Sequence, residues 1–185
     1  MGLLYLVLAI IFIIFIWAVV VFNSLVTKKN RVKNAWSDID VQLKRRYDLV
    51  PNLVETVKGY KDYEASVLEK VTQARTSVLQ AQKESVASRA EAENMLSSAL
   101  KTLFAVSENY PQLRASENFQ KLQQELANLE NDIQSARRYY NAAVREFNIA
   151  VQVFPANLIA GLLGFRQAEF FGAAEAEKEP VKVSF

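Results

Sequence analysis

The chain opens with a continuous apolar run over residues 3–22, where Tyr5 and Trp17 carry the run's few polar side-chain atoms. Twenty residues at 1.5 Å each span about 30 Å, the thickness of a bilayer's hydrocarbon core. A cleaved signal peptide would need a charged start, a shorter apolar run and a cleavage site of small residues, and these are missing. The pattern predicts an uncleaved transmembrane anchor over residues 1–24.

The apolar pattern changes to a helical seam directly after the anchor. Neither Gly nor Pro occurs between the anchor and Pro51, and the seam keeps its phase across this proline. A loop would reset the register, so we predict one helix, kinked at Pro51, that runs from the membrane into a soluble domain. The seam comprises Val32, Trp36, Ile39, Leu43, Arg46, Val50, Leu53 and Val57.

Three further helices are predicted at residues 62–82, 88–109 and 116–154. A strict heptad seam from Phe119 to Phe154 marks the last of them, and Ser88 with Glu91 resembles a capping box at the start of the third. No segment alternates with the period of two typical of strands. The predicted fold is all-α: the transmembrane helix continues into an antiparallel up-down four-helix bundle over residues 25–154.

The fourth helix of such a bundle returns to the membrane side. Residues 155–172 are apolar but too short and Gly-rich to span a bilayer. We predict a membrane-proximal segment that either lies at the membrane interface or folds back over the bundle. Residues 173–185 are rich in Ala, Glu and Lys and are expected to be a disordered tail.

Charge and composition narrow the function. With 22 basic and 20 acidic residues, the chain has no electrostatic case for binding nucleic acid. Four cations follow the anchor, which predicts contact with lipid head groups and a bundle on the cytoplasmic side of a bacterial inner membrane. These membrane-interface residues are Lys28, Lys29, Arg31 and Lys33.

The chain contains neither Cys nor His. Disulfides, thiol catalysis, His-dependent triads and the Glu-x-x-His motifs of di-iron bundles are therefore excluded. Asp38 and Asp40 lie about 200° apart around a helix, which is a poor geometry for an acid–base pair, so we expect surface charge or pairing within the bundle. We expect no catalytic residue, no metal site and no cofactor.

Arg46 is the exception in the first seam, because a buried guanidinium costs several kcal/mol unless it is paired. Other polar residues gather on the last helix and beside the Pro51 kink, where the Tyr47 carbonyl loses its donor. Either they form a hydrogen-bonded network that sets helix register, or they bind a partner protein. The candidate site residues are Trp36, Asp38, Asp40, Arg45, Arg46, Pro51, Asn52, Arg137, Tyr140, Asn141 and Asn148.

Most of these residues lie in motifs that resemble the LemA family of bacterial membrane proteins. The main motif is residues 35–54, Ala-Trp-Ser-Asp-Ile-Asp-Val-Gln-Leu-Lys-Arg-Arg-Tyr-Asp-Leu-Val-Pro-Asn-Leu-Val, and shorter matches occur at 57–60, 110–113, 136–141, 147–148, 154–155 and 164–165. The resemblance implies one N-terminal span, a four-helix bundle and no established catalytic activity. The family includes proteins implicated in forming membrane organelles in magnetotactic bacteria.

Two functional hypotheses follow. The first is a non-enzymatic, membrane-anchored scaffold or adaptor that self-associates or docks other membrane proteins. The second is a ligand-sensing or signal-transducing module, in which a ligand between the helices shifts the kink at Pro51. The predicted partners are membrane lipid, further copies of the chain and other membrane proteins.

Overall fold

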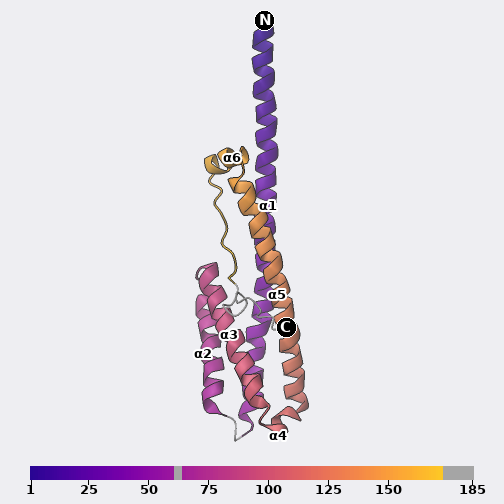
Figure 1. Cartoon of the computed structure of the whole chain (residues 1–185), viewed down its shortest axis with the longest axis vertical. Helices are drawn as coiled ribbons and strands as arrows, with labels where there is room; N and C mark the ends of the chain where they lie inside the picture. Colours follow the sequence, from indigo (N-terminus) through magenta and orange to yellow (C-terminus); the bar gives the residue numbers. More distant parts are fainter. Residues whose placement is uncertain (61–63, 173–185) are drawn as a thin grey trace, which may run out of the picture. The chain divides into compact units, whose positions relative to one another are not determined.

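The structure is a computed structural model, and it describes residues 1–60 and 64–172. Helices make up 85% of this described part, which contains no strand, so the all-α class is confirmed. The helices are listed in chain order in Figure 1: α1 (Gly2–Lys58), α2 (Ala65–Ala81), α3 (Val86–Ser107), α4 (Pro111–Arg114), α5 (Glu117–Gln152) and α6 (Ala156–Leu162). The predicted tail, 173–185, lies outside the described residues.

The chain divides into two compact units, to which both α1 and α5 contribute. The anchor unit contains Met1–Ser37 and Arg138–Glu169. The core unit contains Asp38–Arg137 and, of the described residues after the anchor unit, 170–172. Each unit has its own interior and is described separately below.

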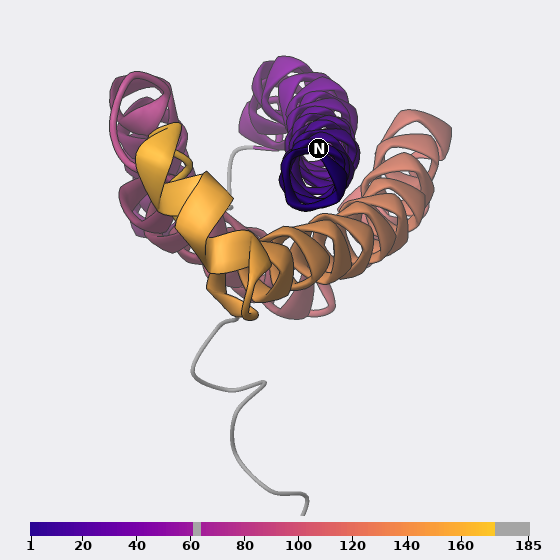
Figure 2. The ribbon, with the colours of Figure 1, turned by 90° about the horizontal axis from the view of Figure 1, so that it is seen from above.

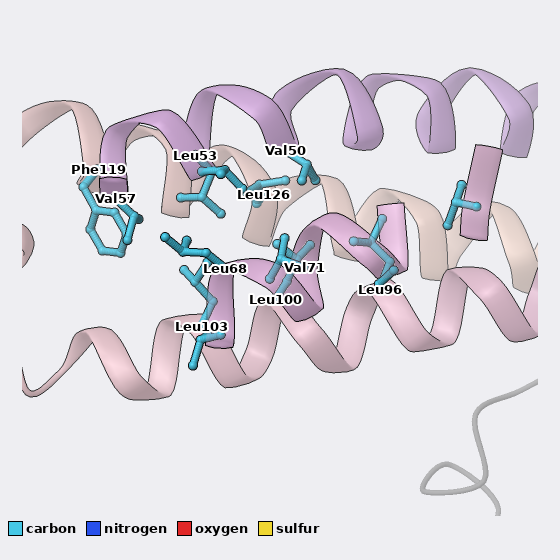
Figure 3. Packing of buried hydrophobic residues seen from close by; sticks show 14 of the residues in the cluster. Val50, Leu53, Val57, Leu68, Val71, Leu96, Leu100, Leu103, Phe119 and Leu126 are labelled. Carbon is cyan, nitrogen blue, oxygen red and sulfur yellow. The ribbon is translucent and has the colours of Figure 1, made fainter. Parts of the chain in front are cut away.

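The interior of the core unit is a hydrophobic cluster supplied by α1, α2, α3, α4 and α5. Figure 3 shows side chains of α1 meeting those of α2 and α3, with Phe119 and Leu126 of α5 joining them. On α1 the predicted seam residues from Ile39 to Val57 are buried. On α2 the buried residues include Val67, Val71, Ala74 and Val78. These positions recur at helical spacing, so one face of each helix is buried away from solvent.

Pro51 lies inside α1 without ending it. The predicted continuity of the helix across this proline is therefore confirmed, and α1 extends over 57 residues. The kink at Pro51 stays a prediction. Helix α1 is also the helix within the described residues that is long and apolar enough to cross a membrane, and no residue of its apolar window is buried.

The start of α3 differs from prediction. Ser85, not Ser88, caps the helix: its hydroxyl accepts a hydrogen bond from the Ser88 backbone N–H. The buried stripe of α3 mixes charged, apolar and small polar side chains, so an apolar pattern alone does not reveal it. It comprises Arg89, Glu93, Leu96, Leu100, Leu103 and Ser107.

The seam of α5 holds from Phe119 to Phe147 but not to its predicted end. Leu122, Ala136 and Ala150 are half-buried, and Phe154 is 74% exposed. The helix ends at Gln152, and the turn that contains Pro155 redirects the chain into α6.

The anchor unit joins the first part of α1 to the end of α5 and to α6. Figure 2 shows α6 beside the C-terminal end of α5. The ring of Phe165 contacts Phe22 of α1 and Phe147 of α5, with centroid distances of 6.2 and 6.4 Å. Residues 2–16 of α1 are all exposed.

Candidate functional site

The candidate site is a cluster of charged side chains buried in the core unit, with Arg46 at its centre. Arg46 is 1% exposed, as its seam position predicts. Its Nη1 donates to Glu130 Oε2 on α5 at 2.8 Å, and its Nη2 donates to the Glu93 carbonyl at 2.8 Å and to Ser97 Oγ at 2.9 Å on α3. One guanidinium thus joins three helices through directional bonds.

Glu93 supplies the opposite charge in the interior. One of its carboxylate oxygens lies 3.4 Å from Arg46 Nη2, and both oxygens are buried without a hydrogen bond among the described residues. Burial raises the pKa of this carboxyl above 4.5, and the Glu130 charge adds to the rise, against the lowering effect of Arg46, Arg89 and Arg137. Desolvation outweighs the cations because no donor satisfies the carboxylate.

Two further arginines complete the cluster. Arg89 of α3 is buried and forms an ion pair with Asp40 of α1, whose side chain is half-exposed. Arg137 Nη1 of α5 donates to Asn94 Oδ1 at 3.1 Å, and its guanidinium stacks 4.7 Å from the centre of the Phe171 ring. The pairs connect α1, α3 and α5 at separate points, so sliding any one of these helices would break several bonds.

The Pro51 site has a specific partner on α2. Proline has no N–H, so the carbonyl of Tyr47, four residues earlier, lacks its helical donor. Arg75 Nε donates to this carbonyl at 3.1 Å. A side chain of a neighbouring helix therefore satisfies the group that proline leaves open.

In the anchor unit, polar side chains of α5 form hydrogen bonds with the backbone of the segment after α6. Asn148 Nδ2 donates to the Ala168 carbonyl at 3.0 Å, while Asn148 Oδ1 accepts from the Ala168 N–H at 2.8 Å. The Tyr140 hydroxyl donates to the Glu169 carbonyl at 2.8 Å. Burial raises the pKa of Tyr140, and the Glu169 charge raises it further. Trp36 packs on the Tyr140 ring at 5.4 Å and is half-buried, whereas Ala35 beside it is fully buried.

The basic residues after the anchor have partners within the anchor unit. Arg31 Nη1 lies 2.8 Å from Glu146 Oε2, and Lys28 Nζ lies 3.9 Å from the same oxygen. Lys29 Nζ sits 5.6 Å from the centre of the Phe165 ring. Lys33 is exposed, and its carbonyl accepts a hydrogen bond from Ser37. Arg31 and Glu146 are about half-exposed in these ion pairs, and Lys28 is half-buried.

The other predicted site residues lie on the surface or at its edge. Asp38 and Asn52 are exposed, and Arg45 is exposed with Gln42 as its neighbour at 3.4 Å. Asn141 is half-buried. Asp38 and Asp40 do not act together, since only Asp40 joins the buried cluster.

Sequence reasoning missed Glu93, Glu130, Arg89 and Arg75. A signal was present for two of them: Arg89 and Glu93 continue, at steps of four and three, the stripe that contains Leu96, Leu100 and Leu103. A buried Arg46 on one helix calls for a carboxylate on such a stripe. Nothing comparable singled out Arg75 or Glu130.

An open groove of about 980 Å³ runs along α2 and α3 in the core unit. Small side chains such as Ala74, Ser77 and Ser98 line it, with Met95 and Phe170 as larger apolar members and with Lys70 and Glu91 as charged ones. Small residues let another helix or a ligand approach the backbone closely. Within the described part of the chain, no group of acidic residues is arranged to hold a metal ion.

These features define a class of protein: all-helical, with a candidate membrane-spanning helix. The later residues of that helix belong to a unit that contains buried arginine–carboxylate pairs. A sequence model of the LemA family matches residues 35–185, and the chain belongs to this family. The family resemblance expected from the sequence is therefore confirmed.

Curated relatives agree with this assignment. The chain is 29% identical to Protein LemA of Metamycoplasma hominis over 88% of its own length and 74% of the relative. It is 26% identical to Magnetosome protein MamQ 2 of Paramagnetospirillum magneticum and 23% identical to Magnetosome protein MamQ of Magnetospirillum gryphiswaldense, in both cases over 86% of its length and 68% of theirs. With the apolar helix, these bacterial relatives indicate a membrane-anchored bacterial protein, and none of their names states a catalytic activity.

Proposed function

We propose that the protein is a non-enzymatic scaffold or adaptor that is anchored in the membrane by α1. In this role the protein self-associates or docks other membrane proteins. The observation that carries the proposal is the open groove along α2 and α3, whose lining includes many small side chains, in a unit whose buried Arg46 is already paired with Glu93 and Glu130. The anchor would confine this surface to the neighbourhood of the membrane, where other membrane proteins are found.

The proposal includes an arrangement of the core helices. We take α1, α2, α3 and α5 to form an antiparallel, up-down four-helix bundle. Support comes from the shared cluster, to which all four helices contribute buried side chains, and from the ion pairs of Arg46 to α3 and α5. Because the chain lacks cysteine, paired cysteines at Ser97 and Glu130 would test the arrangement by cross-linking. Absence of a cross-link would argue against it.

Self-association is tested by mass. The full-length chain in lipid nanodiscs should give a native mass of two or more copies, and a Ser98→Trp variant, which fills the groove, should shift the population toward single copies. Ala127→Trp is the matched control, because Ala127 is exposed on α5 and lies outside the groove. A strictly monomeric protein that also purifies from native membranes without a stoichiometric partner would contradict the proposal.

A ligand-sensing module is the second candidate. Arg75 on α2 donates a hydrogen bond to the Tyr47 carbonyl, which lacks its helical donor because of Pro51. Since α2 also lines the groove, a ligand that moves α2 would act on α1 at this position. A thermal-shift screen of small metabolites on the full-length chain tests it. A stabilising compound whose effect disappears in Ser98→Trp supports sensing, and a screen without such a compound favours the scaffold.

The membrane side follows from the basic residues after the anchor. We place the core unit in the cytoplasm and the anchor in the inner membrane, because cations flanking a span favour the cytoplasmic side. A reporter fused after Phe185 should be active only in the cytoplasm. Activity on the outer side would reverse the topology.

A further inference from the structure

The anchor unit exposes a second apolar surface besides the transmembrane run. Residues 147–165 contain no charged side chain and are bounded by Glu146 and Arg166. Large apolar side chains in this stretch point to solvent at the end of α5 and in α6: Val153 is 52% exposed, Phe154 74%, Leu158 62%, Leu162 83% and Leu163 51%. We call these five residues the α6 patch. Such a density of exposed apolar side chains marks an interaction surface.

The α6 patch lies beside the end of the membrane anchor. Phe165, three residues beyond α6, packs its ring against Phe22, the last residue of the apolar run, at 6.2 Å. On α1 the residues shielded from solvent start at Trp17, and they continue through Ala18 and Val21 to the buried Leu25. These positions share one face of the helix. Trp17 precedes Phe22 by five residues, so the covered face reaches about 7.5 Å into the apolar run.

This depth matches that of helices that lie in a membrane interface, whose apolar face enters about 5–10 Å. Leu158 and Leu162 are four residues apart on α6 and therefore share a face, while Ala160 on the other side is buried against the protein. Cations border the segment, as Lys29 sits on the Phe165 ring and Arg166 follows it. Cations at this level are placed for lipid phosphates.

We propose that the α6 patch inserts into the interfacial layer of the bilayer and forms a second membrane contact next to the anchor. The occupant is lipid rather than protein because Phe165, two residues after the patch, packs on Phe22 at the end of the apolar run, and the bilayer surrounds that run. The inference rests on α1 being the membrane anchor. Two contacts side by side restrain the tilt and rotation of α1, which a single helix leaves free.

Single-cysteine labelling tests the proposal cleanly, since the native chain has no cysteine. The full-length Leu162→Cys variant, labelled with the polarity-sensitive dye NBD and reconstituted into phosphatidylcholine–phosphatidylglycerol vesicles, should fluoresce in an apolar environment and be quenched by nitroxide-labelled lipid. Ile11→Cys, in the exposed apolar run of α1, reports insertion of the anchor. Arg145→Cys, an exposed site on α5, is the control that should stay in water.

The outcomes separate the two claims. Quenching at Ile11 and Leu162 but not at Arg145 supports the proposal. Quenching at Ile11 alone leaves the anchor intact and overturns the second contact. An unquenched Ile11 overturns the anchor and the inference together. Fluorescence at Leu162 that rises with protein-to-lipid ratio and resists the lipid quencher assigns the patch to a second copy and also overturns the proposal.

Discussion

Replacing Arg46 with methionine removes the charge at the centre of the buried cluster while keeping a long side chain. The change deletes the bonds of Nη1 to Glu130 and of Nη2 to Ser97 and to the Glu93 carbonyl. Glu93 is then left without its nearest cation, 3.4 Å away, in a site that is 0% exposed. The perturbation is therefore electrostatic far more than steric.

Breaking a buried pair by removing one partner costs about 3–5 kcal/mol. We expect Arg46→Met toward the lower end, because the Glu130 side chain is 25% exposed and can turn to water. At about 2–4 °C per kcal/mol for a chain of this size, a loss of about 3 kcal/mol should lower the melting temperature by about 6–12 °C. Adding Glu93→Gln should recover part of the loss, since it removes the carboxylate that the first change leaves uncompensated.

Thermal unfolding of the full-length chain in mild detergent, followed by circular dichroism at the helix band, measures the effect. The matched control is Arg45→Met one residue earlier, which is exposed and should change stability by less than about 0.5 kcal/mol. A difference of about 0.5 kcal/mol corresponds to about 1–2 °C in melting temperature. If Arg46→Met melts within that margin of the control, the cluster does not hold the core together and the reasoning fails.

Three other changes test separate parts of the structure. Glu93→Gln should gain stability relative to the native chain as the pH rises past 4.5. The raised pKa means that the folded carboxyl binds its proton more tightly than the unfolded one, so the stability of the native chain falls in the window above 4.5. Melting temperatures of the two chains that run parallel across pH would contradict this. Arg75→Met should cost about 1–2 kcal/mol by leaving the Tyr47 carbonyl unsatisfied, and less in a Pro51→Ala background, where the restored N–H replaces it; equal losses in a double-mutant cycle would refute the pairing. Asn148→Leu breaks two bonds to the chain after α6 and should speed limited proteolysis there, so an unchanged cleavage rate would show that those bonds do not restrain it.

Most of the helical layout was readable from the residues. Twenty apolar residues in succession predict a span, and a stripe with helical spacing predicts which side of α1, α2 and α5 is buried, because burial of apolar surface is local in sequence once the helix period is known. The phase kept across Pro51 predicted an unbroken α1. The burial of Arg46 could also be predicted, because this charged residue occupies a position of the apolar seam.

The partners of that arginine could be settled only by the tertiary structure. A charge inside a protein is tolerated only where an opposite charge and donors meet it, and their meeting depends on how helices far apart in sequence align. Glu93 stood on what looked like the polar flank of α3, and Arg75 looked like a solvated cation on α2; spatial proximity gave both their roles. Likewise the heptad seam of α5 extended to Phe154 in the sequence, but α5 ends at Gln152 and the chain turns at Pro155, which leaves the Phe154 ring exposed.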